Sequence, residues 1–378
     1  DLCGRDGADQ LVFAYSDVSH DFVMDIASRG LAGGADFLIL GPRRTMLQSS
    51  RFTISVCAAR TGVGKSQTTR WIATKLREHG LKAAIIRHPM PYGDLARQAV
   101  QVFRGPEDLD AAECTIEERE EYEPHLEAGH VVYAGVDFER VLRLAEVDAD
   151  VVLWDGGNND FPFLRSDLSI ALVDPFRPLD AGTHHPGETV VRMADIVLVA
   201  KANAAPADAV AAARQDAQAL APRARVLEVG SRVALDDSAA VAGKRVLVVE
   251  DGPTTTHGGM PFGAGYVAAK AAGAGEIVDP RPFAKGALAE AFRAYPHIGH
   301  VLPALGYSDA QRRDLAATLD AADCDAVVCG APIDLARLAH TNKPIVRARY
   351  ELDDYASPSL EAALRAELAK RGRLDLGQ

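Results

Sequence analysis

The stretch that decides the fold is Ala59-Arg60-Thr61-Gly62-Val63-Gly64-Lys65-Ser66. An apolar run over residues 52–58 precedes it and predicts a buried strand, and the apolar positions Trp71, Ile72 and Leu76 that follow recur at helical spacing. A strand, a glycine-rich loop and a helix in this order form a cradle for phosphate groups, because backbone N–H groups and the helix N-terminus point at the anion. We therefore predict a nucleotide-binding loop within an α/β fold.

Two residues of this loop add side-chain chemistry to the cradle. Lys65 is expected to bridge the terminal phosphates of a nucleotide, and the Ser66 hydroxyl is expected to bind Mg²⁺. The usual pattern begins with glycine, whereas this chain has Ala59 at that position. The alternative is an ordinary strand-to-helix turn with a surface lysine. The nucleotide-binding residues that the motif predicts are Thr61, Gly62, Val63, Gly64, Lys65, Ser66 and Gln67.

The composition is typical of a soluble globular protein, with 48% hydrophobic and 25% charged residues. The net charge of −12 argues against a nucleic-acid partner, because binding to a duplex requires a basic surface. No apolar run reaches the roughly 18 residues that cross a bilayer, so we expect no membrane span. The five cysteines are scattered without a paired motif, which favours the reducing cytoplasm over a disulfide framework.

The 378 residues should form two or three domains, since single cores stop growing at about 250–300 residues. Apolar runs that alternate with helical patterns predict a multidomain α/β fold: a central P-loop NTPase parallel sheet with flanking α/β domains. The strand, helix and strand patterns before residue 43 indicate half of a doubly wound domain, whose start we expect to be missing. The expected divisions are 1–50 for that N-terminal domain, 51–240 for the nucleotide-binding domain, 241–350 for a C-terminal α/β domain and 351–378 for a terminal helix and tail.

Polar residues end two further predicted strands at the edge that carries the phosphate loop. Asp155 follows the apolar run 151–154, and a carboxylate at that place is the usual second ligand of Mg²⁺, directly or through water. Arg87, His88 and Asp94 follow a neighbouring strand. The cations would hold a phosphorylated substrate, and Asp94 would bind metal or act as a base. The alternative in each case is a turn with exposed polar residues.

Two other segments have more than one interpretation. The acidic run 115–125 is either a solvated helix face or a lid that carries carboxylates to Mg²⁺, with Arg119 reaching a phosphate. The glycine-rich loop 251–266 lacks a Lys-Ser/Thr pair, so it either binds the anionic part of a substrate or only packs closely. The substrate-binding residues expected in and near this loop are Thr255, His257, Gly258, Gly259 and Arg281.

The run Ala200-Lys201-Ala202-Asn203 stands where a GTPase of this layout reads the base with an Asn-Lys-x-Asp motif. Here Ala200 and Asn203 replace the first asparagine and the carboxylate that grips guanine. Adenine is therefore the better fit, with Asn203 as a nucleotide-binding candidate. The pair His184-His185 is a weak metal signal, and we predict no metal there.

Long, unusual motifs occur in a fixed order along nearly the whole chain. They span residues 13–20, 60–70, 87–94, 117–125, 154–160, 249–253, 257–259 and 295–299. In sequence and order these motifs resemble the cyclic 2,3-diphosphoglycerate synthetase family. The resemblance implies a cytoplasmic enzyme with an N-terminal Rossmann-like domain, a P-loop domain and a C-terminal domain.

The reaction implied by that resemblance uses ATP and Mg²⁺ to close 2,3-diphosphoglycerate into its cyclic pyrophosphate, with release of ADP and phosphate. Lys65, Arg60 and the Mg²⁺ on Ser66 and Asp155 would stabilise the transferring group, mostly by positioning and by neutralising oxyanions. Arg87, His88 and the 254–263 loop would hold the substrate. The catalytic candidates are Lys65, Arg60, Asp155 and His88, and the metal candidates are Ser66, Asp155 and Asp94.

Other functions remain open at this point. A P-loop kinase acting on another small phosphorylated or carboxylic acid fits the same residues. A regulatory GTPase or metallochaperone-like switch predicts an intact base motif and usually a Cys/His cluster, and the chain shows neither. A nucleotide-dependent assembly protein would turn over slowly and retain ADP. For partners we expect a small phosphorylated substrate and a homo-oligomer, most simply a dimer.

Overall fold

The computed structural model describes residues 7–90, 94–156, 160–177, 179–256, 258–305, 308–370 and 372. The chain forms two compact units. The first comprises Asp1–Gln101, Tyr133–Gly230 and Asp353–Gln378, and the second comprises Val102–Val132 and Ser231–Leu352. The chain passes between the units four times, after residues 101, 132, 230 and 352, so neither unit is a continuous stretch of sequence.

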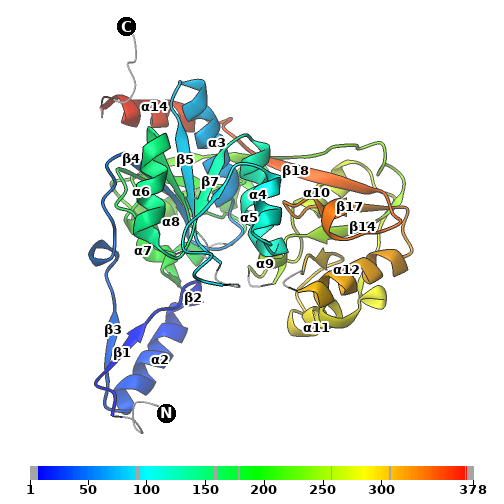
Figure 1. Ribbon diagram of the computed structural model, residues 1–378, viewed down its shortest axis with the longest axis horizontal. Coiled ribbons are helices and arrows are strands. Elements are labelled where there is room, and N and C mark those ends of the chain that lie inside the picture. Colours follow the sequence, from blue (N-terminus) through cyan, green and yellow to red (C-terminus); the bar gives the residue numbers. More distant parts are fainter. Residues whose placement is uncertain are drawn as a thin grey trace. The chain divides into compact units, whose positions relative to one another are not determined.

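A mostly parallel sheet is the centre of the first unit (Figure 1). Its strand order is β12-β11-β9-β4-β8-β5-β7-β6, and the strands from β12 to β5 pair in parallel. The two central strands, β4 and β8, are buried along their whole length, which explains their unbroken apolar character. The strands are β4 (Phe52–Ala58), β5 (Ala83–Arg87), β6 (Gln101–Phe103), β7 (Val131–Ala134), β8 (Val151–Asp155), β9 (Leu168–Val173), β11 (Ile196–Val199) and β12 (Arg225–Glu228).

Helices pack against this sheet and supply its crossover connections (Figure 1). They are α3 (Lys65–Glu78), α6 (Phe138–Asp148), α7 (Gly187–Arg192) and α8 (Ala207–Leu220), with α14 (Leu360–Lys370) near the C-terminus. The predicted α/β class, with a parallel sheet around the phosphate loop, is confirmed. No helix in the described ranges is long and apolar enough to cross a membrane.

The N-terminal segment forms a small layer of its own within the first unit. Strands β1 (Gln10–Phe13) and β3 (Asp36–Ile39) pair in parallel, and α2 (His20–Ala32) connects them. The two-residue strand β2 (Val18–Ser19) pairs antiparallel with β10 (His184–His185), which attaches this segment to the region before α7. A short 3₁₀ turn, η1 (Pro42–Arg44), leads towards β4.

The second unit is built on a second sheet, with order β13-β18-β17-β14-β15 and β16 also paired to β14. Alternate residues of β14 belong to two different hydrophobic clusters. Leu247 and Val249 belong to one cluster, and Val246 and Val248 belong to the other. This strand is therefore buried on both faces. The strands are β13 (Gly230–Leu235), β14 (Arg245–Glu250), β15 (Glu276–Ile277), β16 (Leu302–Pro303), β17 (Ala326–Cys329) and β18 (Ile345–Asp353), and the α-helices are α4 (Pro106–Ala111), α5 (Ile116–Glu127), α9 (Gly252–Thr255), α10 (Ala264–Ala271), α11 (Gly286–Ala294), α12 (Asp309–Ala321) and α13 (Leu335–Leu338).

One close backbone approach joins α7 to the start of the phosphate loop. A Cβ atom on Gly187, the first residue of α7, would lie 2.1 Å from the carbonyl oxygen of Ala59. The obstacle is backbone rather than a flexible side chain, so only glycine fits there. The position of the loop is thus coupled to the packing of α7.

We expect Gly187→Ala to lower the free energy of unfolding by about 1–3 kcal/mol, because overpacking forces the backbone apart. The same displacement of Ala59 should weaken ATP binding. Thermal unfolding and calorimetric ATP titration measure the two effects. Gly182→Ala is the matched control, since a Cβ there would contact only the Leu220 methyl groups at 4.0 Å. Equal stability of the two variants would contradict the coupling.

Candidate functional site

The phosphate loop connects the carboxyl end of β4 to the first turn of α3. Gly62 has φ +76° and Gly64 has φ +121°, a region that side-chain-bearing residues rarely adopt. A Cβ on Gly64 would also meet the Gln67 Nε2 at 2.5 Å. Gly64 is the N-cap of α3 and contributes no side-chain cap, so the positive end of the helix dipole faces the loop. This geometry fits an anion.

The expected metal and substrate residues Ser66, Arg87 and Asp155 are brought together at this edge. Arg87 and Asp155 are register partners at the carboxyl ends of the adjacent strands β5 and β8. The Arg87 Nη1 atom lies 2.8 Å from Asp155 Oδ2 and 3.4 Å from the Ser66 hydroxyl oxygen. Arg87 is 2% exposed and Asp155 fully buried. A cationic group therefore already lies against both expected Mg²⁺ ligands.

The oxygen atoms of Ser66 and Asp155 suit Mg²⁺, which prefers oxygen ligands and binds through few protein groups when a nucleotide supplies the rest. Because both contact one Arg87 nitrogen, they are close enough to share a cation. Among the described residues, no group of three or more His, Cys, Asp or Glu side chains is placed to hold a metal ion. The two oxygen ligands present fit an Mg²⁺ ion that is also held by a nucleotide.

Lys65 is nine-tenths buried at the start of α3. Burial lowers the pKa of its ammonium group, and the nearby Asp155 carboxylate partly offsets this effect. A buried cation of this kind is stabilised by an opposite charge. Phosphate oxygens in the loop would supply that charge, as the sequence predicts for Lys65.

Arg60 and Thr61 bind the N-terminal segment. The Arg60 Nε lies 2.7 Å from Asp17 Oδ1 and its Nη1 2.9 Å from Asp180 Oδ2. The Thr61 hydroxyl donates to Asp17 Oδ2 at 3.0 Å, and Arg60 Nη1 is 3.0 Å from His184 Nε2. Burial and the Arg60 charge lower the pKa of His184. The Arg60 guanidinium, which the family resemblance places at the transferring phosphoryl group, is therefore held by two carboxylates in this structure.

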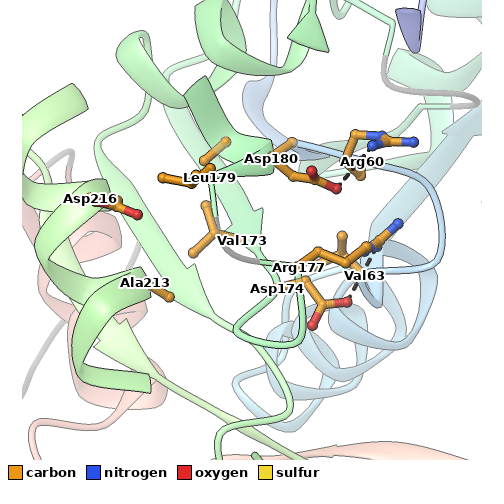
Figure 2. Close-up of a pocket in the computed structure, with 11 residues that line it drawn as sticks. Arg60, Val63, Val173, Asp174, Arg177, Leu179, Asp180, Ala213 and Asp216 are labelled. Atoms are coloured by element: carbon orange, nitrogen blue, oxygen red, sulfur yellow. Dashed lines mark hydrogen bonds and ion pairs between the residues drawn. The ribbon is translucent and has the colours of Figure 1, made fainter. Parts of the chain in front are cut away.

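A second cluster, formed by Asp174, Arg177 and Lys201, was not predicted from the sequence. Its two cations donate hydrogen bonds to backbone carbonyl groups of the phosphate loop. Lys201 Nζ donates to the Gly62 carbonyl at 2.8 Å and contacts Asp174 Oδ2 at 2.9 Å. Arg177 Nη2 donates to the Thr61 carbonyl at 2.7 Å and also pairs with Asp174 (Figure 2). Asp174 follows the apolar strand β9 just as Asp155 ends β8, so the same sequence rule would have found it. The sequence pattern indicates Lys201 only as part of a base-reading motif.

The pocket in Figure 2 lies between this support and α8. It has room for about a single water molecule, so it does not accommodate a nucleotide. Lys65, Ser66, Arg87 and Asp155 do not line it. Its lining residues are Ala59, Arg60, Val63, Val173, Asp174, Arg177, Leu179, Asp180, Ala181, Ala213 and Asp216.

His88 forms a dyad with Asp160, which the sequence reasoning did not single out as a site residue. The His88 Nδ1 lies 2.7 Å from Asp160 Oδ2, and the Ser16 hydroxyl donates to Asp160 Oδ1 at 3.2 Å. Burial alone would raise the pKa of Asp160, but His88 and Ser16 bring it below its usual value. The His88 side chain is 38% exposed. Its ring is thus held at Nδ1 and accessible to solvent.

Two other candidates of the first unit lie in exposed turns. Asp94 Oδ1 accepts a hydrogen bond from the Ala96 amide at 2.9 Å, the usual arrangement of a turn carboxylate. Asn203 is exposed in the turn after β11, and its side chain covers Gly230, where a Cβ would lie 2.8 Å from Asn203 Cγ. The expected roles of Asp94 and Asn203 stay predictions. The segments 91–93 and 157–159, parts of two quoted motifs, lie outside the described residues.

The substrate residues expected in the second unit have structural partners there. The Thr255 hydroxyl is buried and donates to the Asp251 carbonyl at 2.9 Å. Gly258 donates its amide to the Pro253 carbonyl, and Gly259 has φ +68°. Arg281 pairs with Asp279 at 3.0 Å and lies over the Phe292 ring. His257 lies outside the described residues.

The acidic run 115–125 forms the N-cap and most of α5, and the interpretation as a solvated face is wrong. Glu118, Glu120 and Glu123 are at most 6% exposed. Glu123 pairs with Arg119 at 3.0 Å, and Arg119 also contacts Asp110, so Arg119 has two carboxylate partners. Burial and the neighbouring Asp251 raise the pKa of Glu120 well above its usual value. The helix is an internal element of the second unit.

No protein-family model matches the chain. The chain is 54% identical to arginine synthetase ArcE of Thermococcus kodakarensis over 356 residues, which cover 94% of this chain and 80% of that protein. The chain belongs to the arginine synthetase ArcE family. With its phosphate loop, it is an ATP-dependent P-loop enzyme of the ligase or kinase type.

The solved structures that match the chain are more distant in sequence. LpxK from Aquifex aeolicus in complex with ATP is 12% identical with a TM-score of 0.47, and the match covers 92% of this chain and 95% of that one. The hydrogenase maturation factor HypB from Archaeoglobus fulgidus is 14% identical with a TM-score of 0.30, and the match covers 47% and 80%. The named relative is an arginine synthetase and not a cyclic 2,3-diphosphoglycerate synthetase.

We expect Lys201→Met to weaken ATP binding about tenfold, because a charge-assisted hydrogen bond to the Gly62 carbonyl contributes roughly 1.5–3 kcal/mol. The substitution keeps the length of the side chain but leaves Asp174 without this cation. Calorimetric titration with ATP measures the change. Lys82→Met, an exposed position of the same unit, is the control. A dissociation constant within twofold of the original would show that Lys201 does not support the loop.

Proposed function

We propose that this protein makes arginine in an ATP-dependent reaction that releases ADP and phosphate. The observation that carries the proposal is the 54% identity to arginine synthetase ArcE over 94% of the chain. The phosphate loop with Lys65 and Ser66 supports the ATP-dependent part, because this loop type positions the terminal phosphoryl group for transfer.

The chemistry of arginine limits the substrates. Its guanidinium carbon carries three nitrogens, and the amino acid with oxygen in place of one terminal nitrogen is the ureido compound citrulline. Phosphoryl transfer from ATP to the ureido oxygen gives ADP and an isourea phosphate. Ammonia then attacks the carbon, the C–O bond breaks, and inorganic phosphate leaves with the bonding electron pair. The net reaction is citrulline, ammonia and ATP to arginine, ADP and phosphate.

The cations of the loop region suit the first step. Lys65 and Arg87 would neutralise the charge that develops on the transferring phosphoryl oxygens, and such electrostatic stabilisation is usually the largest catalytic contribution. Mg²⁺, held by Ser66 and Asp155, would supply further positive charge to the β- and γ-phosphates. Arg87 already contacts both of these residues, so its guanidinium would change partners when nucleotide and metal bind.

The His88–Asp160 dyad suits the proton transfer in the second step. An ammonium ion must lose one proton before its nitrogen can attack the carbon. The attacking nitrogen then gains positive charge as the C–N bond forms, and it must lose a second proton if it is to stay neutral. With Nδ1 held against Asp160, the Nε2 atom of His88 is the ring nitrogen left to accept a proton. We therefore assign His88 as the general base and Asp160 as the residue that positions it.

Closure of 2,3-diphosphoglycerate to its cyclic pyrophosphate is the second candidate function. The long motifs quoted above favour it, and it shares the phosphoryl transfer to a substrate oxygen and the release of ADP and phosphate. The two candidates differ in the attacking group, which is a second phosphate in one case and an external nitrogen in the other. A kinase acting on another small acid would stop at the phosphorylated product.

A product assay separates these functions. With Mg²⁺, ATP, citrulline and ¹⁵N-ammonium, we expect arginine carrying one ¹⁵N by mass spectrometry, and ADP with phosphate by ³¹P NMR. Lys65→Ala should reduce the rate at least a hundredfold, since it removes a cation at the transferring group, whereas Lys82→Ala should not. AMP and pyrophosphate, or a cyclic pyrophosphate signal from 2,3-diphosphoglycerate with no arginine, would contradict the proposal.

We expect His88→Ala to lower kcat about a hundredfold, in line with the loss of a general base, with ATP affinity unchanged within twofold. Added imidazole should restore part of the rate, which a purely structural role would not allow. Asp160→Asn should lower kcat less, because the base remains but is held less well. His340→Ala, an exposed histidine of the second unit, is the control for imidazole effects. Absence of rescue would overturn the assignment of His88.

A further inference from the structure

A second hollow lies at the opposite edge of the first unit's sheet. It is formed where β9, β11 and β12 begin, with contributions from η1, the end of α7 and α14, and its volume is about 1110 Å³. This is at least as large as a typical small-molecule site. We call it the arginine groove. Its charged lining residues are Arg43, Arg165, Arg192, Arg223, Arg225 and Lys370, against Asp167, Asp195 and Glu367.

Each of the three carboxylates of the arginine groove has a hydrogen-bond or ion-pair partner within the protein. Asp167 accepts the Thr53 amide at 2.9 Å and Asp195 accepts the Ser169 amide at 2.8 Å, so both fix the starts of strands. Glu367 pairs with Lys370. Among the cations, Arg192 pairs with Glu188. The groove therefore holds more positive charge than its own carboxylates balance.

Four arginines supply most of the groove's positive charge. They make no ion pair within the part of the chain that the structure describes, although the chain carries 53 acidic residues against 41 basic ones. In a chain of net charge −12, cations without a counter-ion are expected to be scattered, yet these gather in one hollow. They are Arg43, Arg165, Arg223 and Arg225.

The remaining lining indicates what the groove would accept. The Ser166 hydroxyl oxygen is buried and has no hydrogen-bond partner among the described residues. Met46, Met193 and Leu220 supply apolar wall. Arginine guanidinium groups bind phosphate and carboxylate through paired N–H donors, which makes several of them together selective for ligands with more than one anionic group.

We propose that the arginine groove binds a small molecule that carries at least two phosphate or carboxylate groups. The site is separate from the phosphate loop. Strand β4 runs from the groove edge to the loop over seven residues, and at about 3.3 Å per residue the two sites are roughly 20 Å apart. The groove thus takes its ligand while the nucleotide site is filled. The proposal does not depend on which reaction the enzyme catalyses.

Calorimetric titration of the protein, saturated with ADP and Mg²⁺, tests this with two probes. Inorganic pyrophosphate represents phosphate ligands and citrate represents carboxylates. We expect saturable binding of at least one probe, and the double variant Arg165→Ser/Arg225→Ser should raise its dissociation constant at least tenfold. Arg140→Ser, an exposed arginine of the same unit outside the groove, should change it less than twofold. All the substituted side chains are exposed, so folding should survive, and thermal unfolding checks this.

Lys65→Ala locates the binding independently. If the probe occupies the groove, this variant retains it, and only the groove variant loses it. Loss of binding in Lys65→Ala with retention in the groove variant would place the probe at the phosphate loop and overturn the proposal. Equal binding by all variants, or no saturable binding of either probe, would also overturn it, because the four arginines would then be ordinary solvated charges.

Discussion

The contact between Arg87 and Asp155 is the interaction on which the phosphate site depends. Both residues are almost fully buried, and a buried pair of this kind costs roughly 3–5 kcal/mol when one partner is removed. The pair forms only if β5 and β8 are neighbours, parallel and in the observed register, because each residue is the last of its strand. The order of strands in the sheet therefore determines the chemistry at its edge.

The remaining charges around the loop divide into two groups with different tasks. Arg60, Arg177 and Lys201 each contact a carboxylate, and they hold the loop or the segment beside it in place. Lys65 and Arg87, which also lies against the Asp155 carboxylate, are the cations that the proposed function assigns to the phosphates. Under the proposed function, the first group would position the loop and the second would stabilise the transition state.

The sequence predicts features that depend on neighbouring residues, but it does not predict contacts between residues that are far apart along the chain. The loop, its flanking strand and helix, and Asp155 follow from patterns within a few residues. Asp17 lies 43 residues from Arg60 and Ser16 lies 144 residues from Asp160, so no spacing rule could find these contacts. The burial of α5 was hidden because its charged residues are paired inside the second unit, notably Glu123 with Arg119 and the Asp334 amide.

Net charge is a poor guide to what this chain binds. The net charge of −12 would determine the electric field at long distance in the absence of salt. At physiological salt, however, the field of any exposed charge is screened within about 8 Å. Within that distance only the nearest side chains matter. At the carboxyl edge of the sheet these include the cations Lys65 and Arg87, and at the amino edge they include four arginines without carboxylate partners in the described ranges. An acidic protein can therefore carry cations at both ends of one sheet, while nearby carboxylates accept hydrogen bonds from backbone amides or pair with other cations.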